Sequence, residues 1–234
     1  KYPDKVDSDR ELNTRMESII SAVENDSIVF FQYPSMVSTR YDTCFVKHIK
    51  KKKNVALIIW IEDLKSVIDV DSYADINDEI QLFNEADLLI LQSVEMRDYL
   101  IQEGMKDIPY CIQKIWEFPY GFLKKNIIIN KDFYFAKKLS VERMCEITTV
   151  GIGMVESIND TYDKIINPLP IGFYICAGIP VMVHGKTNVS RLVTKYGIGF
   201  VMSDSETADE VLNRISDEDI TKAVEQEKKL APAV

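Results

Sequence analysis

The sequence predicts an α/β fold built from two halves in series, each with its own parallel sheet. Short, continuous apolar runs alternate with amphipathic helical segments along the chain, which is typical of parallel strands whose sheet is covered on both faces. Residues 117–125, which include Pro119, Gly121 and two lysines, interrupt this alternation. We therefore expect an N-terminal domain at 1–116, a linker at 117–125, and a C-terminal domain with a helical tail at 126–234.

The N-terminal half begins with a capping box, Ser8-x-x-Glu11, in front of an apolar helical periodicity. A second cap, Ser93, precedes a helix that Gly104 is expected to close. The expected strands are 27–33, 55–61, 87–93 and 110–116, and the expected helices between them lie around 41–49, 76–83 and 94–104.

The C-terminal half repeats the alternation. Its expected strands are 126–130, 148–155, 181–185 and 198–203, and its expected helices lie around 133–145, 171–177, 189–196, 209–215 and 217–229. The turn Ala177-Gly178-Ile179-Pro180 joins a helix to a short β-branched run, and its simplest interpretation is a helix C-cap. Ligands of such folds bind outside the carboxyl ends of the strands, so the cleft between the two domains is the expected site.

Composition narrows the function. The net charge of −9 disfavours nucleic-acid binding, and we interpret the basic run at 50–53 as a solvated helix end. No apolar run approaches the roughly 20 residues of a membrane-spanning helix. Four widely spaced cysteines and two histidines suit a reduced, cytoplasmic protein without a zinc site or a Ser-His-Asp triad. We expect neither a metal nor a bound cofactor.

A set of motifs follows in a fixed order along most of the chain. They are FFQYPSMVSTRYD (30–42), FNEADLLILQSVEMRDYLIQEGM (83–105), IWEFP (115–119), GIGMV (151–155), IGFYICAGIPVMV (171–183) and YGIGFVM (196–202). In this order they resemble the GT-B glucosyltransferases that add the second sugar, onto O-linked N-acetylglucosamine, of serine-rich-repeat adhesins in streptococci and lactobacilli. That family is in turn similar to bacterial galactofuranosyltransferases.

The resemblance implies two Rossmann-like domains, with the acceptor on the N-terminal one and the nucleotide sugar on the C-terminal one. It implies a UDP-sugar donor, expected to be UDP-glucose, and an acceptor glycoprotein that already carries N-acetylglucosamine. It also implies assembly into a homo-oligomer, expected to be a tetramer.

The chain departs from this family at several points. Pro170 stands where a lysine usually faces the nucleotide phosphates, Glu62-Asp63 replaces a His-Asp pair, and Arg191 replaces a glutamate. A leading strand–helix unit, and a segment after the linker that carries a nucleotide-binding arginine, have no counterpart here. The chain is therefore expected to be either incomplete or a decayed paralogue.

The donor site needs positive charge or aligned N–H groups, because the leaving group is a diphosphate. Gly151, Gly153 and Gly172 stand near strand ends and a helix start, where the backbone can approach a phosphate; a packing role is the alternative for Gly151 and Gly153. The resemblance adds residues 177–180 to this site. Lys164 is a candidate substitute for the missing lysine, and the alternative is a solvated loop lysine.

The acceptor site is expected at the end of the first strand. Gln32, Pro34 and Ser35 lie at the carboxyl end of that strand, and the Gln32 amide could bond to sugar hydroxyls in both directions. A loop amide that caps backbone groups is the alternative. Trp116 could stack on a sugar face, although an interdomain core position suits it equally.

An inverting transfer also needs a base on the acceptor hydroxyl. Asp63 or Glu62, at the end of the second strand, could supply it, and a helix N-cap is the alternative for the aspartate. The leading hypothesis is therefore a metal-independent hexosyltransferase. A non-catalytic paralogue that acts as a scaffold in adhesin glycosylation is the second, and another α/β transferase is the third.

Overall fold

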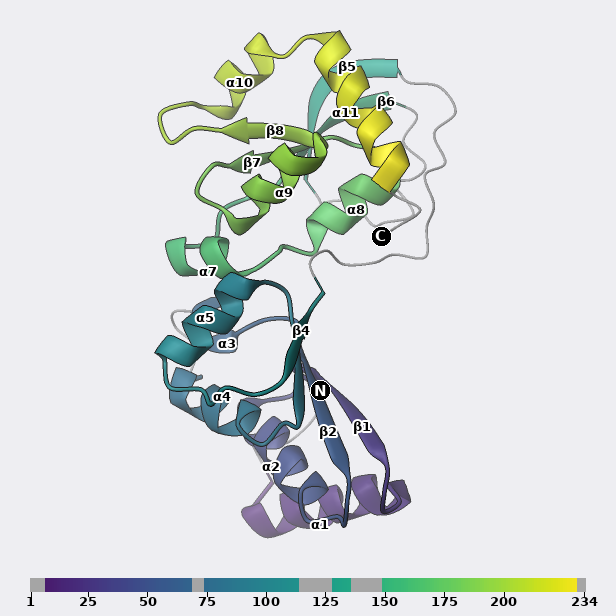
Figure 1. The fold of residues 1–234 in the computed structure, drawn as a ribbon, viewed down its shortest axis with the longest axis vertical. Helices are drawn as coiled ribbons and strands as arrows, with labels where there is room; N and C mark the ends of the chain where they lie inside the picture. Colours follow the sequence, from purple (N-terminus) through teal and green to yellow (C-terminus); the bar gives the residue numbers. More distant parts are fainter. Residues whose placement is uncertain (1–6, 69–73, 114–127, 136–148, 231–234) are drawn as a thin grey trace. The chain divides into compact units, whose positions relative to one another are not determined.

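The computed structural model describes residues 7–68, 74–113, 128–135 and 149–230. The chain divides into two compact units, Lys1–Gln113 and Lys114–Val234, and Figure 1 shows the helices and strands of each. The expected linker at 117–125 falls outside the described residues.

The N-terminal unit holds a four-stranded sheet with the strand order β1-β2-β3-β4, and every neighbouring pair is parallel. Its strands are β1 (Ile28–Tyr33), β2 (Ala56–Ile61), β3 (Leu88–Leu91) and β4 (Tyr110–Ile112). Its helices are α1 (Asp9–Ile19), the 3-10 helix η1 (Ile20–Ala22), α2 (Thr39–Ile49), α3 (Lys65–Ile68), α4 (Ile76–Phe83) and α5 (Val94–Gln102).

Local signals fix the ends of these helices as expected. The backbone N–H of Glu11 donates to Ser8 Oγ at 3.3 Å, and the Ser8 N–H donates to Glu11 Oε2 at 2.8 Å, which completes the capping box. Ser93 Oγ accepts from the Met96 N–H at 2.9 Å at the start of α5. Gly104, with φ +105°, follows the end of that helix.

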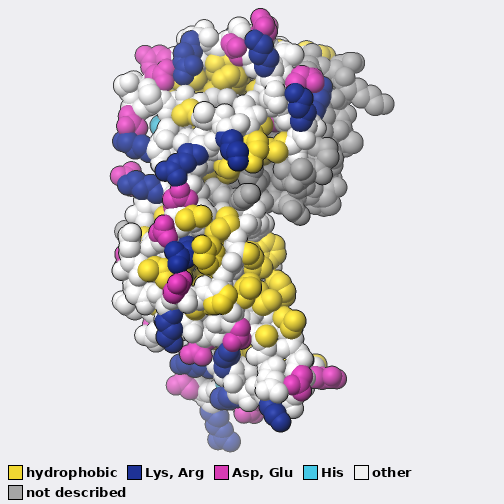
Figure 2. Space-filling model, viewed as in Figure 1, with side chains coloured by type: hydrophobic (Ala, Val, Ile, Leu, Met, Phe, Trp, Pro, Cys, Tyr) yellow, Lys and Arg dark blue, Asp and Glu magenta, His cyan; other side chains and the backbone are white. Residues whose placement is uncertain are grey.

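The N-terminal sheet is buried on alternate residues. Phe31 and Tyr33 of β1 are buried, whereas Ile28 and Phe30, earlier in the same strand, are 69% and 63% exposed. Figure 2 shows hydrophobic side chains gathered on this unit where the strands lie in Figure 1. The expectation of cover on both faces is therefore not met by the described helices. Apolar runs show that both faces are apolar, but they cannot show whether a second layer is present.

The C-terminal unit holds a second parallel sheet, with the strand order β5-β6-β7-β8. Its strands are β5 (Ile128–Phe135), β6 (Thr149–Met154), β7 (Val181–His184) and β8 (Gly199–Met202). Its helices are α7 (Asp160–Ile165), α8 (Pro170–Ala177), α9 (Asn188–Tyr196), α10 (Ala208–Arg214) and α11 (Asp217–Leu230).

This second sheet has apolar cores on both faces. Val181 and Val183 of β7 pack in a cluster with Ile175 of α8. Met182, which lies between them, packs in a separate cluster with Val211 of α10. Since successive side chains of a strand point to opposite faces, the sheet is covered on both sides, as the sequence predicts.

One expected helix is wrong in its first part. The segment 133–135 continues strand β5, whereas a helix was expected from Phe133, and the rest of that helix lies outside the described residues. The pairing of β5 with β6 shifts register between Ile129 and Phe133, and Lys131 within this irregularity has φ +50°. The irregularity falls on the polar segment 130–132. The aromatic run 133–135, which has high β propensity, then resumes pairing with β6.

Candidate functional site

The carboxyl edge of the N-terminal sheet carries a polar residue from every strand. Gln32 is the penultimate residue of β1, and Glu62, Gln92 and Gln113 directly follow β2, β3 and β4. In open parallel sheets this edge is where ligands bind.

Glu62 lies at the centre of this group. Gln32 Nε2 donates a hydrogen bond to Glu62 Oε1, and Gln92 Nε2 donates to the Glu62 main-chain carbonyl. The Glu62 N–H donates to the Tyr33 carbonyl at 2.8 Å. The structure therefore brings together Gln32 and Glu62, which the sequence assigns separately to acceptor binding and to catalysis. Asp63 follows Glu62 and is half-buried.

The Glu62 carboxyl group has an altered acidity. Burial raises the pKa of Glu62 above its usual value, and the hydrogen bond from Gln32 opposes that rise. A carboxylate with a raised pKa at a ligand-binding edge is suited to accept a proton.

Sequence reasoning did not single out Trp60, Gln92 or Gln113. Trp60 Nε1 donates to Gln113 Oε1 at 2.6 Å, and the buried Gln92 bonds to Glu62 as described. A signal was available, because each of the two glutamines directly follows an apolar run, as Glu62 does.

A fully buried carboxylate, Glu79 of α4, supports the loop after β2. It accepts hydrogen bonds from the Tyr33 hydroxyl at 2.7 Å, from the Lys65 N–H at 2.7 Å and from the Ser66 N–H at 3.2 Å. Burial and the neighbouring Glu79 raise the pKa of Tyr33. These bonds connect the end of β1 to the start of α3, three residues beyond Glu62.

The other predicted acceptor residues are placed differently. Ser35 Oγ donates to Asp42, whose carboxylate is fully buried and lies 3.2 Å from Lys65 Nζ. Burial raises the pKa of Asp42, and the Ser35 and Lys65 interactions oppose this. Pro34 is buried, whereas Gln32 is exposed. Trp116 lies outside the described residues.

On the C-terminal unit, α8 begins without a side-chain cap. Its N-cap is Leu169, which is 42% exposed and makes no capping hydrogen bond. Pro170 occupies the first helical position, where its missing N–H costs nothing. The N–H groups of the first turn, which includes Gly172, therefore have no side-chain acceptor from the N-cap, and they carry the positive end of the helix dipole.

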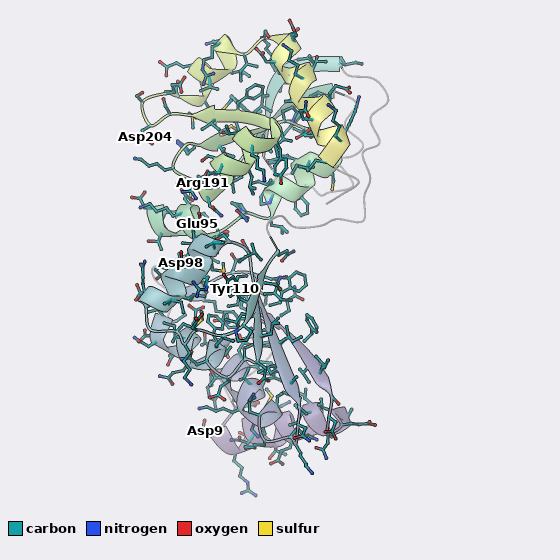
Figure 3. The ribbon with its side chains drawn as sticks, in the orientation of Figure 1. Asp9, Glu95, Asp98, Tyr110, Arg191 and Asp204 are labelled. Carbon is teal, nitrogen blue, oxygen red and sulfur yellow. The ribbon has the colours of Figure 1, made fainter. Side chains whose placement is uncertain are left out.

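The start of α9 is connected to this region. Asn188 Nδ2 donates to Oδ1 of the buried Asn167 at 2.8 Å, and Asn167 lies shortly before α8. Lys186 Nζ and the Asp204 carboxylate, 2.8 Å apart, connect the loops after β7 and β8. Arg191, in the first turn of α9, is exposed, and Figure 3 labels it and Asp204.

Gly151 and Gly153 lie inside β6, where packing explains both. A Cβ at Gly153 would lie 2.5 Å from the ring of the buried Tyr174, and one at Gly151 would lie 2.2 Å from the Asp132 carbonyl. The Gly153 N–H donates to the Pro180 carbonyl at 2.8 Å. The packing alternative therefore accounts for these two glycines without a ligand.

We expect Gly153→Ala to lower the free energy of unfolding by about 2 kcal/mol, since the Tyr174 ring has little room to retreat. The Tyr174 hydroxyl donates to the Tyr134 carbonyl at 2.9 Å and to the Met154 carbonyl at 3.1 Å, and these bonds hold the ring in place. Urea denaturation followed by circular dichroism measures the change. Gly185→Ala is the matched control, because the nearest atom to its added Cβ is 3.4 Å away. An unchanged midpoint for Gly153→Ala would contradict the packing role.

The turn at 177–180 lies at the C-terminal end of α8, whereas Gly172 lies in the first turn of that helix. A helix that joins two parallel strands runs antiparallel to them, and the eight residues of α8 span about 12 Å. Gly178 has φ +65°, and the Ile179 N–H donates to the Tyr174 carbonyl at 2.9 Å. The structure does not bring this turn together with Gly172, and the C-cap interpretation explains it.

Lys164 is exposed near the end of α7. Its neighbour Asp163 is buried and accepts from Ser157 Oγ and, at 3.2 Å, from the Ile158 N–H.

Within the described ranges, no group of three His, Cys, Asp or Glu side chains could hold a metal ion. In the same ranges, no helix is long and apolar enough to cross a lipid bilayer.

Comparison with known protein families gives two matches, one for each half of the chain. The N-terminal domain of the glucosyltransferase 3-like family matches residues 1–115, and the C-terminal domain of that family matches residues 120–234. Glucosyltransferase 3 of Streptococcus gordonii is 24% identical over 270 residues, which cover 96% of this chain and 80% of that protein. Glucosyltransferase 3 of Streptococcus parasanguinis is 21% identical, with 99% and 81% covered.

Solved structures give the fold. HepE from Anabaena, solved in complex with UDP and glucose, has a TM-score of 0.54 at 10% identity and covers 100% of this chain and 79% of its own. Sucrose-phosphate synthase from Thermosynechococcus elongatus has a TM-score of 0.52 at 10% identity, with 95% and 71% covered. Both are GT-B glycosyltransferases. The paired domain matches, together with the two parallel sheets, lead to one conclusion: this chain belongs to the glucosyltransferase 3-like family of GT-B glycosyltransferases.

Proposed function

We propose that the chain transfers a hexose, expected to be glucose, from a UDP-sugar to N-acetylglucosamine on a serine-rich-repeat glycoprotein. The observation that carries this proposal is the Gln32–Glu62 pair at the carboxyl edge of the N-terminal sheet. Family membership supports the reaction class, and HepE, a structural neighbour, was solved with UDP and glucose.

In the proposed reaction, the acceptor hydroxyl oxygen forms a bond to the anomeric carbon of the donor sugar. The bond from that carbon to the diphosphate breaks, and UDP leaves with the electron pair. Glu62 takes the hydroxyl proton as the base. The first turn of α8 stabilises the developing charge on the diphosphate through its N–H groups and its dipole, without a metal.

The test is titration calorimetry of the protein with UDP and with UDP-glucose, without added metal. Micromolar binding, followed by transfer to a peptide that carries N-acetylglucosamine, would support the proposal. A folded chain that binds neither nucleotide would favour the scaffold hypothesis. Glu62, Pro170 and Arg191, which stand in place of the family's histidine, lysine and glutamate, support that hypothesis. Light scattering of the same sample checks the expected tetramer.

We expect Leu169→Asp to weaken UDP binding about tenfold while it stabilises α8. The negative charge of the aspartate complements the helix dipole, but it repels the diphosphate at the same place. Leu169→Asn is the matched control, since it has a similar size and polarity without the charge. Calorimetry and thermal unfolding measure the two effects. Equal UDP affinity in both variants would mean that the diphosphate does not bind at the start of α8.

A further inference from the structure

Gln32 and Glu62 are brought together by the register of two parallel strands. Gln32 lies opposite Trp60 in the β1–β2 ladder. Glu62 is two residues beyond Trp60, so the alternation of side chains directs it to the same face. Gln32 is exposed, yet its amide is bonded to the carboxylate beside it.

The backbone and the side chain of Glu62 are held by different groups. Its N–H donates to the Tyr33 carbonyl, and its carbonyl accepts from Gln92 Nε2. Its carboxylate accepts from Gln32 Nε2. The bonds to Tyr33 and Gln92 therefore hold the backbone of Glu62 in position, and the bond from Gln32 orients its carboxylate.

Charged residues on the adjoining elements are engaged elsewhere. Lys65 pairs with the buried Asp42, and Glu79 is fully buried in its own network. Burial raises the pKa of Glu62 and the bond from Gln32 lowers it, and no charged side chain of the described residues is a cause of the shift. The amide is thus the group that opposes the effect of burial on this carboxylate.

We propose that Gln32 is a positioning residue for Glu62: its amide directs the carboxylate toward the acceptor hydroxyl. This inference rests on the proposed function of Glu62 as the base. It gives Gln32 a role through Glu62, which differs from the direct contact with the acceptor sugar that its sequence position first indicates.

The experiment compares the pH dependence of kcat/KM in the wild type and in Gln32→Met, which keeps the side-chain length but removes the donor. Without the bond, burial acts unopposed and the pKa of Glu62 rises. The acid limb of the profile then moves to higher pH, with a loss of about tenfold on that limb and an unchanged acceptor KM. Gln102→Met, at the exposed end of α5, is the matched control and leaves the profile in place.

A second readout separates this inference from the proposed function. Isotope-labelled glutamate allows the Glu62 carboxyl group to be titrated by NMR, with its signal assigned through Glu62→Gln. A higher Glu62 pKa in Gln32→Met supports the positioning contact, whether or not the protein transfers sugar. The absence of transferase activity would overturn the proposed function and leave this contact in place. An unmoved acid limb and an unmoved Glu62 pKa, with a raised acceptor KM, would overturn the positioning role and leave Gln32 as an acceptor ligand.

Discussion

Replacement of Glu62 by glutamine is expected to lower kcat/KM for sugar transfer by about 10³-fold, within the usual contribution of a general base. The amide keeps the shape of the side chain and its place beside Gln32, but it cannot take a proton. The UDP affinity measured by calorimetry is expected to stay unchanged, because the proposed diphosphate site is on the other unit. Steady-state kinetics with a peptide that carries N-acetylglucosamine measures the loss.

Asp63→Asn is the matched variant for this experiment. Asp63 is the next carboxylate along the chain and was the other candidate for the base. A modest effect of Asp63→Asn beside a large effect of Glu62→Gln supports the assignment. The reverse order of effects would transfer the role to Asp63.

Replacement of Glu79 by alanine is expected to lower the free energy of unfolding by about 4 kcal/mol. The substitution leaves the Tyr33 hydroxyl and the N–H groups of Lys65 and Ser66 without their acceptor, and it opens a cavity where the side chain was fully buried. Denaturant unfolding monitored by circular dichroism measures the change.

Two variants define the origin of that loss. Asp78→Ala removes the neighbouring carboxylate of α4, which is exposed, and is expected to have little effect. Tyr33→Phe removes one of the donors and is expected to cost about 1 kcal/mol. A loss in Glu79→Ala no larger than that in Asp78→Ala would show that the buried network contributes little to stability.

The helix and strand assignments show where sequence reasoning succeeds. The helix at Ile76–Phe83 has its predicted bounds, and α8, α9 and α11 lie within a residue or so of theirs. Caps and apolar periodicity act over a few residues, so they can be read directly from the sequence. The strand at Phe133 was missed because the register shift before it depends on the partner strand β6. The short helices α3 and α7 have too few turns to give a clear period.

For the candidate site, the individual residues could be predicted from the sequence, but the contacts between them could not. Glu62 and Gln32 could be chosen individually, because each follows or ends an apolar run. Their hydrogen bond could not be predicted, since it depends on the register between β1 and β2. Gly153 is the opposite case: its spacing resembles a phosphate-binding loop, whereas the Tyr174 ring, distant in sequence, occupies the space beside it.

The sequence by itself determined the α/β class, the ends of most helices and the likeness to the glucosyltransferase 3-like family. These follow from local propensity, capping and the order of short motifs. The tertiary structure alone decided that Gln32 holds the Glu62 carboxylate, that Ser35 belongs to the buried Asp42, and that the turn at 177–180 closes α8 away from Gly172. Each of these depends on which strands pair, in which register and in which direction, and a one-dimensional pattern does not contain that information.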